Sequence, residues 1–183
     1  MEDTFSIRVV IALAVANALA GLACAVLVAV VLRRADGKKA GVLPYFAALV
    51  GAYFIECVAL AMGMTIPVFN VGLALAWGVL LGVRLRARAS GHEALRAALF
   101  FALYSSLPAV SLLLVPVMAL VGGWHIVSAE DGARFGIPSF VPWPAHTILG
   151  FYAGLAAGTT LMKSLITVGI VRLVVSRASR PHP

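Results

Sequence analysis

The sequence predicts an all-α integral membrane protein, a single transmembrane domain over residues 1–183 that folds as a bundle of five transmembrane helices. Two observations predict this class. The composition is 62% hydrophobic and 11% charged with a mean hydropathy of +1.04, whereas a soluble domain carries about 25% charged residues. The chain also contains five apolar stretches that reach the length of roughly 17–25 residues which a helix needs to cross the hydrocarbon core.

The first three predicted spans follow one another through short connections. The first, about 5–32, is interrupted by Arg8, which lies close enough to the end of the span for its guanidinium to reach the headgroups. The second span covers about 42–64 and the third about 66–83. Because the connection between these two is tight, we expect the second and third helices to form a hairpin.

The last two predicted spans enclose the one substantial loop. The fourth span, about 94–122, contains Pro108 and Pro116, and each proline removes a backbone donor and predicts a kink that nearby serines can compensate. The fifth span covers about 146–175. The segment between them, 123–145, is too polar and too rich in proline to cross the bilayer. Its aromatic residues suit the headgroup level, so we expect an extracytoplasmic cap.

Basic residues predict the orientation of the bundle. Three clusters hold most of the Lys and Arg residues: Arg33, Arg34, Lys38 and Lys39; Arg84, Arg86, Arg88 and Arg96; and Arg172, Arg177 and Arg180. Because Lys and Arg in short loops mark the cytoplasmic side, we expect the N-terminus outside and the C-terminus in the cytoplasm. The Ala-rich and Arg-rich chain favours a prokaryotic plasma (inner) membrane. This placement of charge suits membrane lipids as partners and argues against nucleic acid.

Small residues at four-residue spacing predict where helices approach closely. The strongest stripe is Gly150, Gly154 and Gly158 in the fifth span. Similar stripes are Ala12, Ala16 and Ala20 in the first span and Ala74, Gly78 and Gly82 in the third. We expect these stripes to pack within the chain in the first place. Because the chain is small and has few loops, we also expect a homo-oligomer or an association with other membrane subunits.

Two ionisable residues lie well inside the predicted spans, Glu56 in the second and Lys163 in the fifth. A charge at that depth costs about 2.5–3.5 kcal/mol even on the lenient insertion scale, so each needs a partner. We expect the two side chains to form a pair that lines the interior of the bundle. Thr160, Ser164 and Thr167 extend the same side of the fifth helix into a polar face. This seam is a candidate pathway for an ion or small solute, or else an ion pair that only fixes the helix register.

Two histidines flank the predicted cap, His125 at the end of the fourth span and His146 at the start of the fifth. Their common depth is compatible with a haem, metal or quinone site at the outer face. Histidines at the interface are more commonly amphipathic residues without a ligand.

The sequence carries no Gly-rich phosphate loop, nucleophile elbow, HExxH or CxxC motif, so enzymatic catalysis is not expected. The leading hypothesis is a small membrane-embedded component that moves an ion or small solute between the second and fifth helices. The alternatives are a membrane anchor subunit of a redox complex, holding haem or quinone near His125 and His146, and a scaffold without a ligand.

Overall fold

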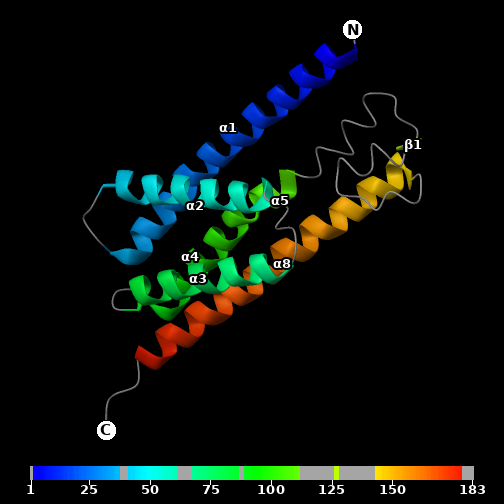
Figure 1. Ribbon diagram of the computed structural model, residues 1–183. Coiled ribbons are helices and arrows are strands. Elements are labelled where there is room, and N and C mark those ends of the chain that lie inside the picture. Colours follow the sequence, from blue (N-terminus) through cyan, green and yellow to red (C-terminus); the bar gives the residue numbers. More distant parts are fainter. Residues whose placement is uncertain are drawn as a thin grey trace.

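The computed structural model describes residues 2–37, 41–61, 67–86, 89–111, 126–127 and 143–178. They form helices α1 (Glu2–Asp36), α2 (Leu43–Ala61), α3 (Pro67–Leu85), α4 (Gly91–Ser105), α5 (Leu107–Ser111) and α8 (Ala145–Ala178), and two short strands, β1 (Ile126–Val127) and β2 (Trp143–Pro144) (Figure 1). The predicted all-α class is confirmed. Because α5 directly continues α4 after a break, the helices form five units, one for each predicted span.

Three helical stretches are long and apolar enough to cross a membrane, Val15–Asp36, Gly91–Ser111 and Leu149–Arg177. Two shorter apolar helices, Leu43–Ala59 and Phe69–Leu85, correspond to the second and third predicted spans. Helix length and hydropathy thus support a multi-pass membrane protein.

Local signals set helix ends that hydropathy alone misplaces. Helix α1 continues beyond the apolar stretch and ends at Asp36. The next residue, Gly37, has a φ of 62°, a left-handed conformation, and its N–H donates to the carbonyl of Arg34 (3.2 Å). Helix α4 begins before its apolar stretch, because Ser90 and Glu93 form a reciprocal capping box. The predicted end of the fourth span, 112–122, lies outside the described residues.

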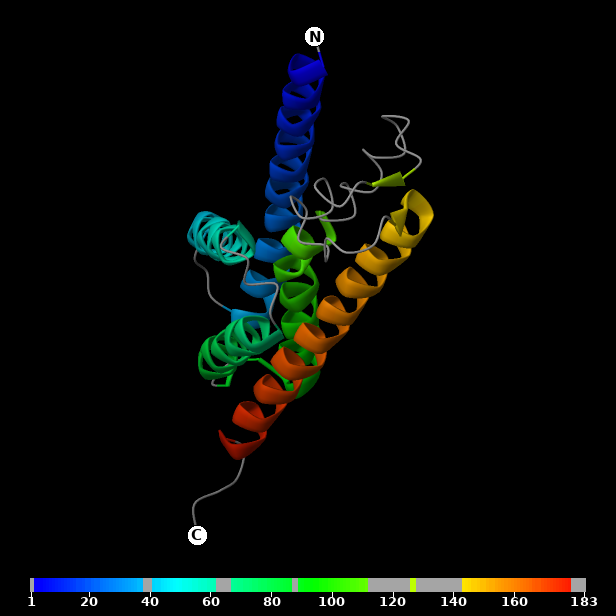
Figure 2. The ribbon, with the colours of Figure 1, turned by 45° about the vertical axis from the view of Figure 1, so that its right-hand side comes forward.

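Successive helices alternate in direction, so the chain ends and connections separate to two ends of the bundle. The C-terminal ends of α1, α3 and α8 and the N-terminal ends of α2 and α4 lie at one end (lower left in Figure 1). These helix ends carry Arg33, Arg34, Arg84, Arg86 and Arg177. We call this the basic end. The N-terminus and the strands lie at the other end, which we call the cap end. Strands β1 and β2 are antiparallel and join the two edges of the predicted cap (Figure 2). Most of that cap lies outside the described residues.

Helices α2 and α3 pack on different neighbours. Helix α8 packs chiefly on α3 and α4, while α1 packs chiefly on α2 and α4. The expected hairpin is therefore not a packed pair, although the two helices follow one another along the chain. The reason is the stripe of small residues on α3, which gives this helix a closer fit to α8 than to α2.

The stripe of Ala74, Gly78 and Gly82 packs within the chain, as predicted. A Cβ placed on Gly78 would lie 2.8 Å from the Cβ of Ile170, and one placed on Gly82 would lie 2.9 Å from the Cβ of Val174. Only glycine allows the backbones of α3 and α8 to approach this closely.

Helix α1 buries a different stripe from the one predicted. The predicted stripe of Ala12, Ala16 and Ala20 is exposed. The buried face instead carries Gly21, Ala25 and Ala29, and a Cβ on Gly21 would lie 2.7 Å from the ring of Tyr53 in α2. Both stripes have four-residue spacing, so the spacing alone does not predict which of them is buried.

The hydrophobic core occupies the half of the bundle nearer the basic end. It includes Leu32 of α1, Leu49 of α2, Leu85 of α3, Phe101 of α4 and Val171 of α8. Toward the cap end, the described parts of α1 and α8 diverge (Figure 2).

Candidate functional site

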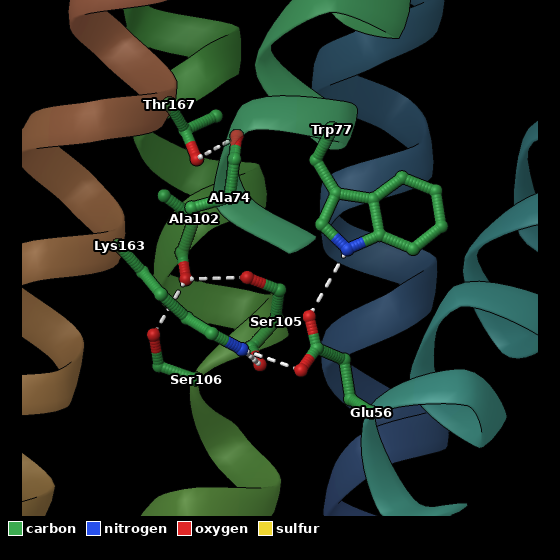
Figure 3. A network of polar contacts seen from close by, with 8 residues as sticks. All are labelled: Glu56, Ala74, Trp77, Ala102, Ser105, Ser106, Lys163 and Thr167. Atoms are coloured by element: carbon green, nitrogen blue, oxygen red, sulfur yellow. Dashed lines mark hydrogen bonds and ion pairs between the residues drawn. The ribbon is translucent and has the colours of Figure 1, made fainter. Parts of the chain in front are cut away.

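The predicted pair between Glu56 and Lys163 forms at the border of this core. Lys163 Nζ donates to Glu56 Oε2 at 2.5 Å, joining the middle of α8 to the last turns of α2 (Figure 3). Both residues are buried: the relative exposure is 4% for Glu56 and 1% for Lys163. The pairing inferred from their depth in the spans is confirmed.

A tryptophan holds the second carboxylate oxygen. Trp77 of α3 donates its indole Nε1–H to Glu56 Oε1 at 3.0 Å (Figure 3). The carboxylate is thus oriented by a donor that carries no charge, and its position does not depend on Lys163 alone. The sequence contained a usable signal for this contact, because an indole in the middle of an apolar span needs a partner for its N–H.

A break between α4 and α5 supplies the third partner. Lys163 Nζ also donates to the carbonyl oxygen of Ser105, the last residue of α4, at 3.1 Å. The helix breaks at Ser106 because Pro108 has no N–H for the carbonyl four residues earlier. The predicted kink at Pro108 is therefore confirmed.

Serine side chains donate to backbone carbonyl groups on both sides of this break. The hydroxyls of Ser105 and Ser106 both donate to the carbonyl of Ala102, at 3.0 and 2.8 Å. Ser111 donates to the carbonyl of Pro108 at 2.5 Å. The carbonyl of Ser105, in contrast, receives a charged donor from another helix. The break therefore turns a backbone group that normally stays inside its own helix toward the ion pair.

The resulting network joins four helices around one positive and one negative charge. Taking both charges out of water costs several kcal/mol per ion, and their attraction offsets this cost only with close geometry and additional hydrogen bonds. Both conditions are met here, since Glu56 accepts from two donors and Lys163 donates to two acceptors. Removing either charge would leave the other without its counter-charge in an apolar interior.

The three residues of the predicted polar face of α8, Thr160, Ser164 and Thr167, lie in different surroundings. Thr167 is buried and donates to the carbonyl of Ala74 at 3.3 Å, so it fastens α8 to α3. Thr160 is half-buried. The hydroxyl oxygen of Ser164 is buried, and it has no hydrogen-bond partner among the residues that the structure describes. These residues share the helix with Lys163, but none of them contributes a hydrogen bond to the ion pair within the described part of the chain.

A second buried carboxylate, which sequence reasoning missed, lies at the basic end. Asp36 at the end of α1 is 0% exposed. It accepts from the hydroxyl of Tyr45 at 2.5 Å and pairs with Arg84 at 3.2 Å between Nη2 and Oδ2. The guanidinium of Arg84 also lies 4.9 Å from the ring centroid of Tyr45. This cluster ties the ends of α1, α2 and α3 together. Arg84 therefore has a structural contact in addition to the orienting charge inferred from the sequence.

A row of aromatic rings connects α1 to the ion pair. The ring of Tyr53 lies 5.8 Å from that of Tyr104, Tyr104 lies 6.4 Å from Phe101, and Phe101 lies 5.6 Å from Trp77. The two tyrosines are anchored by hydrogen bonds, from Tyr53 to the side chain of Asn17 and from Tyr104 to a carbonyl of α2. Phe101 and Tyr104 belong to the core, and Tyr53 and Trp77 pack against it, so the row links the core to the residue that holds Glu56.

The outer histidines are not brought together by the described residues. His146 is exposed in the first turn of α8, and His125 lies outside the described part of the chain. Among the described residues, no group of three or more His, Cys, Asp or Glu side chains is placed to hold a metal ion. The haem, metal or quinone hypothesis stays a prediction.

The glycine stripe of α8 is exposed. No described residue lies within 4 Å of a Cβ placed on Gly150, Gly154 or Gly158. The described helices therefore supply no partner for this stripe. Its expected packing, within the chain or against a second copy or another subunit, stays a prediction.

Comparison with known proteins gives no match, since no family model, no curated protein and no solved structure is similar to this chain.

Proposed function

We propose that the chain is a five-span protein of a prokaryotic plasma membrane, with its N-terminus outside, that moves a small monovalent cation through the seam between α2 and α8. The orientation rests on the gathering of Arg33, Arg34, Arg84, Arg86 and Arg177 at one end of the bundle, which is the arrangement expected of a cytoplasmic face. In this arrangement α2 crosses the membrane outward and α3 crosses it back, so that Arg33 and Arg34 lie on the same side as Arg84.

The observation that carries this proposal is the burial of Glu56 and Lys163 inside apolar helices. An ionisable residue at membrane depth is costly, and in membrane proteins such residues usually belong to ion or substrate pathways. Glu56 is the pathway residue in this proposal, because a carboxylate can bind a proton or a small cation. Lys163 supplies the counter-charge of this carboxylate when no cation is bound.

The helix break next to the pair supports the same function. Transporters commonly bind cations where a helix is interrupted and its free carbonyls face the site. Here the α4–α5 break presents the carbonyl of Ser105 to the charge of Lys163, 3.1 Å away. A cation at this position would meet the same carbonyl oxygen.

The location of the core suggests from which end an ion arrives. The packed cluster lies on the basic side of the pair, and the row of Tyr53, Tyr104, Phe101 and Trp77 links the two. The buried hydroxyl of Ser164 is a polar group that a passing ion or its water could use. We therefore propose entry from the cap end, with Glu56 as the carboxylate that an ion reaches inside the bundle.

The test is ion flux into vesicles that contain only the purified protein. Vesicles loaded with a pH-sensitive dye are exposed to gradients of protons, Li⁺, Na⁺ or K⁺, and the dye and cation contents are followed with time. We expect flux above protein-free vesicles for at least one of these ions, and a loss of about tenfold or more in Glu56→Gln, because the amide cannot carry the charge.

A matched control is Glu93→Gln, which removes a carboxylate at the basic end but keeps the capping box, since Gln serves in that position as well as Glu. This variant should move ions at the wild-type rate. Equal flux in Glu56→Gln and Glu93→Gln, or no flux of any of the four ions, would contradict the proposal. A haem band in the visible spectrum of the purified protein would instead favour the redox-anchor hypothesis.

A further inference from the structure

We infer that the ammonium group of Lys163 occupies a monovalent-cation site formed by Glu56 Oε2 and the Ser105 carbonyl, and that an alkali cation enters this site in exchange for the proton of Lys163. This inference rests on the proposed function, and it specifies the ligand class and the coupling at the same site.

The two oxygens that surround Lys163 Nζ are ligands of the kind that hard cations prefer. A carboxylate oxygen at 2.5 Å and a main-chain carbonyl oxygen at 3.1 Å come from two different helices and converge on one point (Figure 3). The carboxylate stays oriented when the ammonium leaves, because Trp77 holds its other oxygen. The Ser105 carbonyl likewise remains available, because the helix break turns it toward the site. A cation would thus find its protein ligands already in place.

Charge balance fixes what must leave when a cation enters. With Lys163 charged, the site holds one carboxylate and one ammonium. If the cation takes the carboxylate, an ammonium without a counter-charge would remain in the apolar bundle, and a buried charge in that state loses its proton instead. The balanced exchange is one alkali cation bound, one proton released from Nζ, and the neutral amine left on Lys163. No net charge enters the protein.

The groups that face Lys163 from each packed helix make this exchange possible. Helix α2 contributes Glu56, the titratable group whose charge acts on Lys163 in the described part of the chain, with the thiol of Cys57 beside it. Helix α3 contributes the indole of Trp77, and the α4–α5 break contributes the Ser105 carbonyl, and neither of these titrates. Lys163 Nζ is the group that holds its protons at the two oxygens of the site, so the exchange assigns the released proton to Lys163.

Proton release on cation binding tests this directly and needs no transport. Purified protein in detergent and weak buffer receives LiCl, NaCl or KCl, and the released protons are counted with an indicator dye. N-methylglucamine chloride at equal ionic strength serves as the control for salt. We expect release approaching one proton per chain for at least one alkali cation and none for N-methylglucamine. The apparent Kd for the cation should fall about tenfold for each unit by which the pH is raised, since one proton leaves for each cation bound.

The decisive variant is Lys163→Arg. Arginine keeps the positive charge and can pair with Glu56, so this variant should fold, yet its guanidinium does not give up a proton. We expect no proton release and no cation binding from Lys163→Arg or Glu56→Gln, and wild-type behaviour from Glu93→Gln. A structural role for the pair would leave Lys163→Arg and the wild type alike, because neither would release protons.

The possible outcomes separate this inference from the function on which it rests. Ion flux that depends on Glu56 but occurs without alkali-dependent proton release overturns the inference and leaves the proposed function standing. Proton release without flux supports the cation site and overturns transport. The absence of both overturns both. Release that persists in Lys163→Arg shows that the proton comes from another group, and overturns the inference.

Discussion

Replacing one member of the Glu56–Lys163 pair should destabilise the protein more than replacing both. In Lys163→Met the buried carboxylate keeps the Trp77 indole but loses its counter-charge, and breaking a buried pair in this way costs about 3–5 kcal/mol. In the double variant Glu56→Gln/Lys163→Met no charge remains and the indole keeps an oxygen acceptor. The main loss is the donor to the buried Ser105 carbonyl, which costs about 1–3 kcal/mol when this oxygen is left without a partner. The double variant should therefore be more stable than Lys163→Met by about 2 kcal/mol.

Unfolding by sodium dodecyl sulfate in mixed micelles, followed by far-ultraviolet circular dichroism, measures these differences. All four proteins of the cycle are compared: the wild type, the two single variants Glu56→Gln and Lys163→Met, and the double variant. A strongly non-additive cycle is expected because the two side chains touch. If the cost of the double variant equals the sum of the single costs, the two charges do not stabilise each other as a pair.

Three further predictions concern packing, the basic end and orientation. Gly78→Ala places a Cβ 2.8 Å from the Cβ of Ile170 and should cost about 1–3 kcal/mol in the same unfolding assay, whereas Gly72→Ala on the same helix meets no described residue within 4 Å and should be neutral or stabilising. Asp36→Asn should destabilise by about 1–3 kcal/mol and Tyr45→Phe by less, because the first alters both contacts of the buried carboxylate and the second removes only one. A fluorescent protein fused to the C-terminus should fluoresce in cells, and alkaline phosphatase fused there should be inactive; the reverse result would contradict a cytoplasmic C-terminus.

The helices and the ion pair could be predicted from the sequence because each rests on a strong local signal. Long apolar stretches fix where helices lie, and a charge within such a stretch must find a partner, which for Glu56 meant Lys163. The serines near Pro108 likewise follow a local rule. None of these inferences required the rotation of one helix against another.

The rest of the site depends on how each helix is rotated about its axis against its neighbours. This rotation could not be predicted from a single sequence. Trp77 and the Ser105 carbonyl reach the pair from helices whose facing sides are set by packing. Asp36 escaped attention because it follows two arginines at a helix end, where an acidic residue usually lies in solvent. Its burial is explained only by Tyr45 and Arg84, which approach from two other helices.

The stripes of small residues illustrate the same limit. Stripes with equal spacing occur on α1, α3 and α8, and in the described structure the one on α3 packs closely while those predicted on α1 and α8 are exposed. Whether a stripe packs closely depends on the side chains of the helix that faces it. Ile170 and Val174 present branched side chains that fill the space over Gly78 and Gly82, and such complementary shapes come from a second helix.

The hydrogen bond between Trp77 and Glu56 also gives the protein an intrinsic optical probe. Indole emission responds to the charge of a group bound to its N–H, and this N–H is bound to the carboxylate of the ion pair at 3.0 Å. The chain has three tryptophans, so replacing Trp124 and Trp143 with phenylalanine would leave a single emitter at the pair. Its spectrum would then report, in an intact membrane and without a label, each time the charge beside the indole changes.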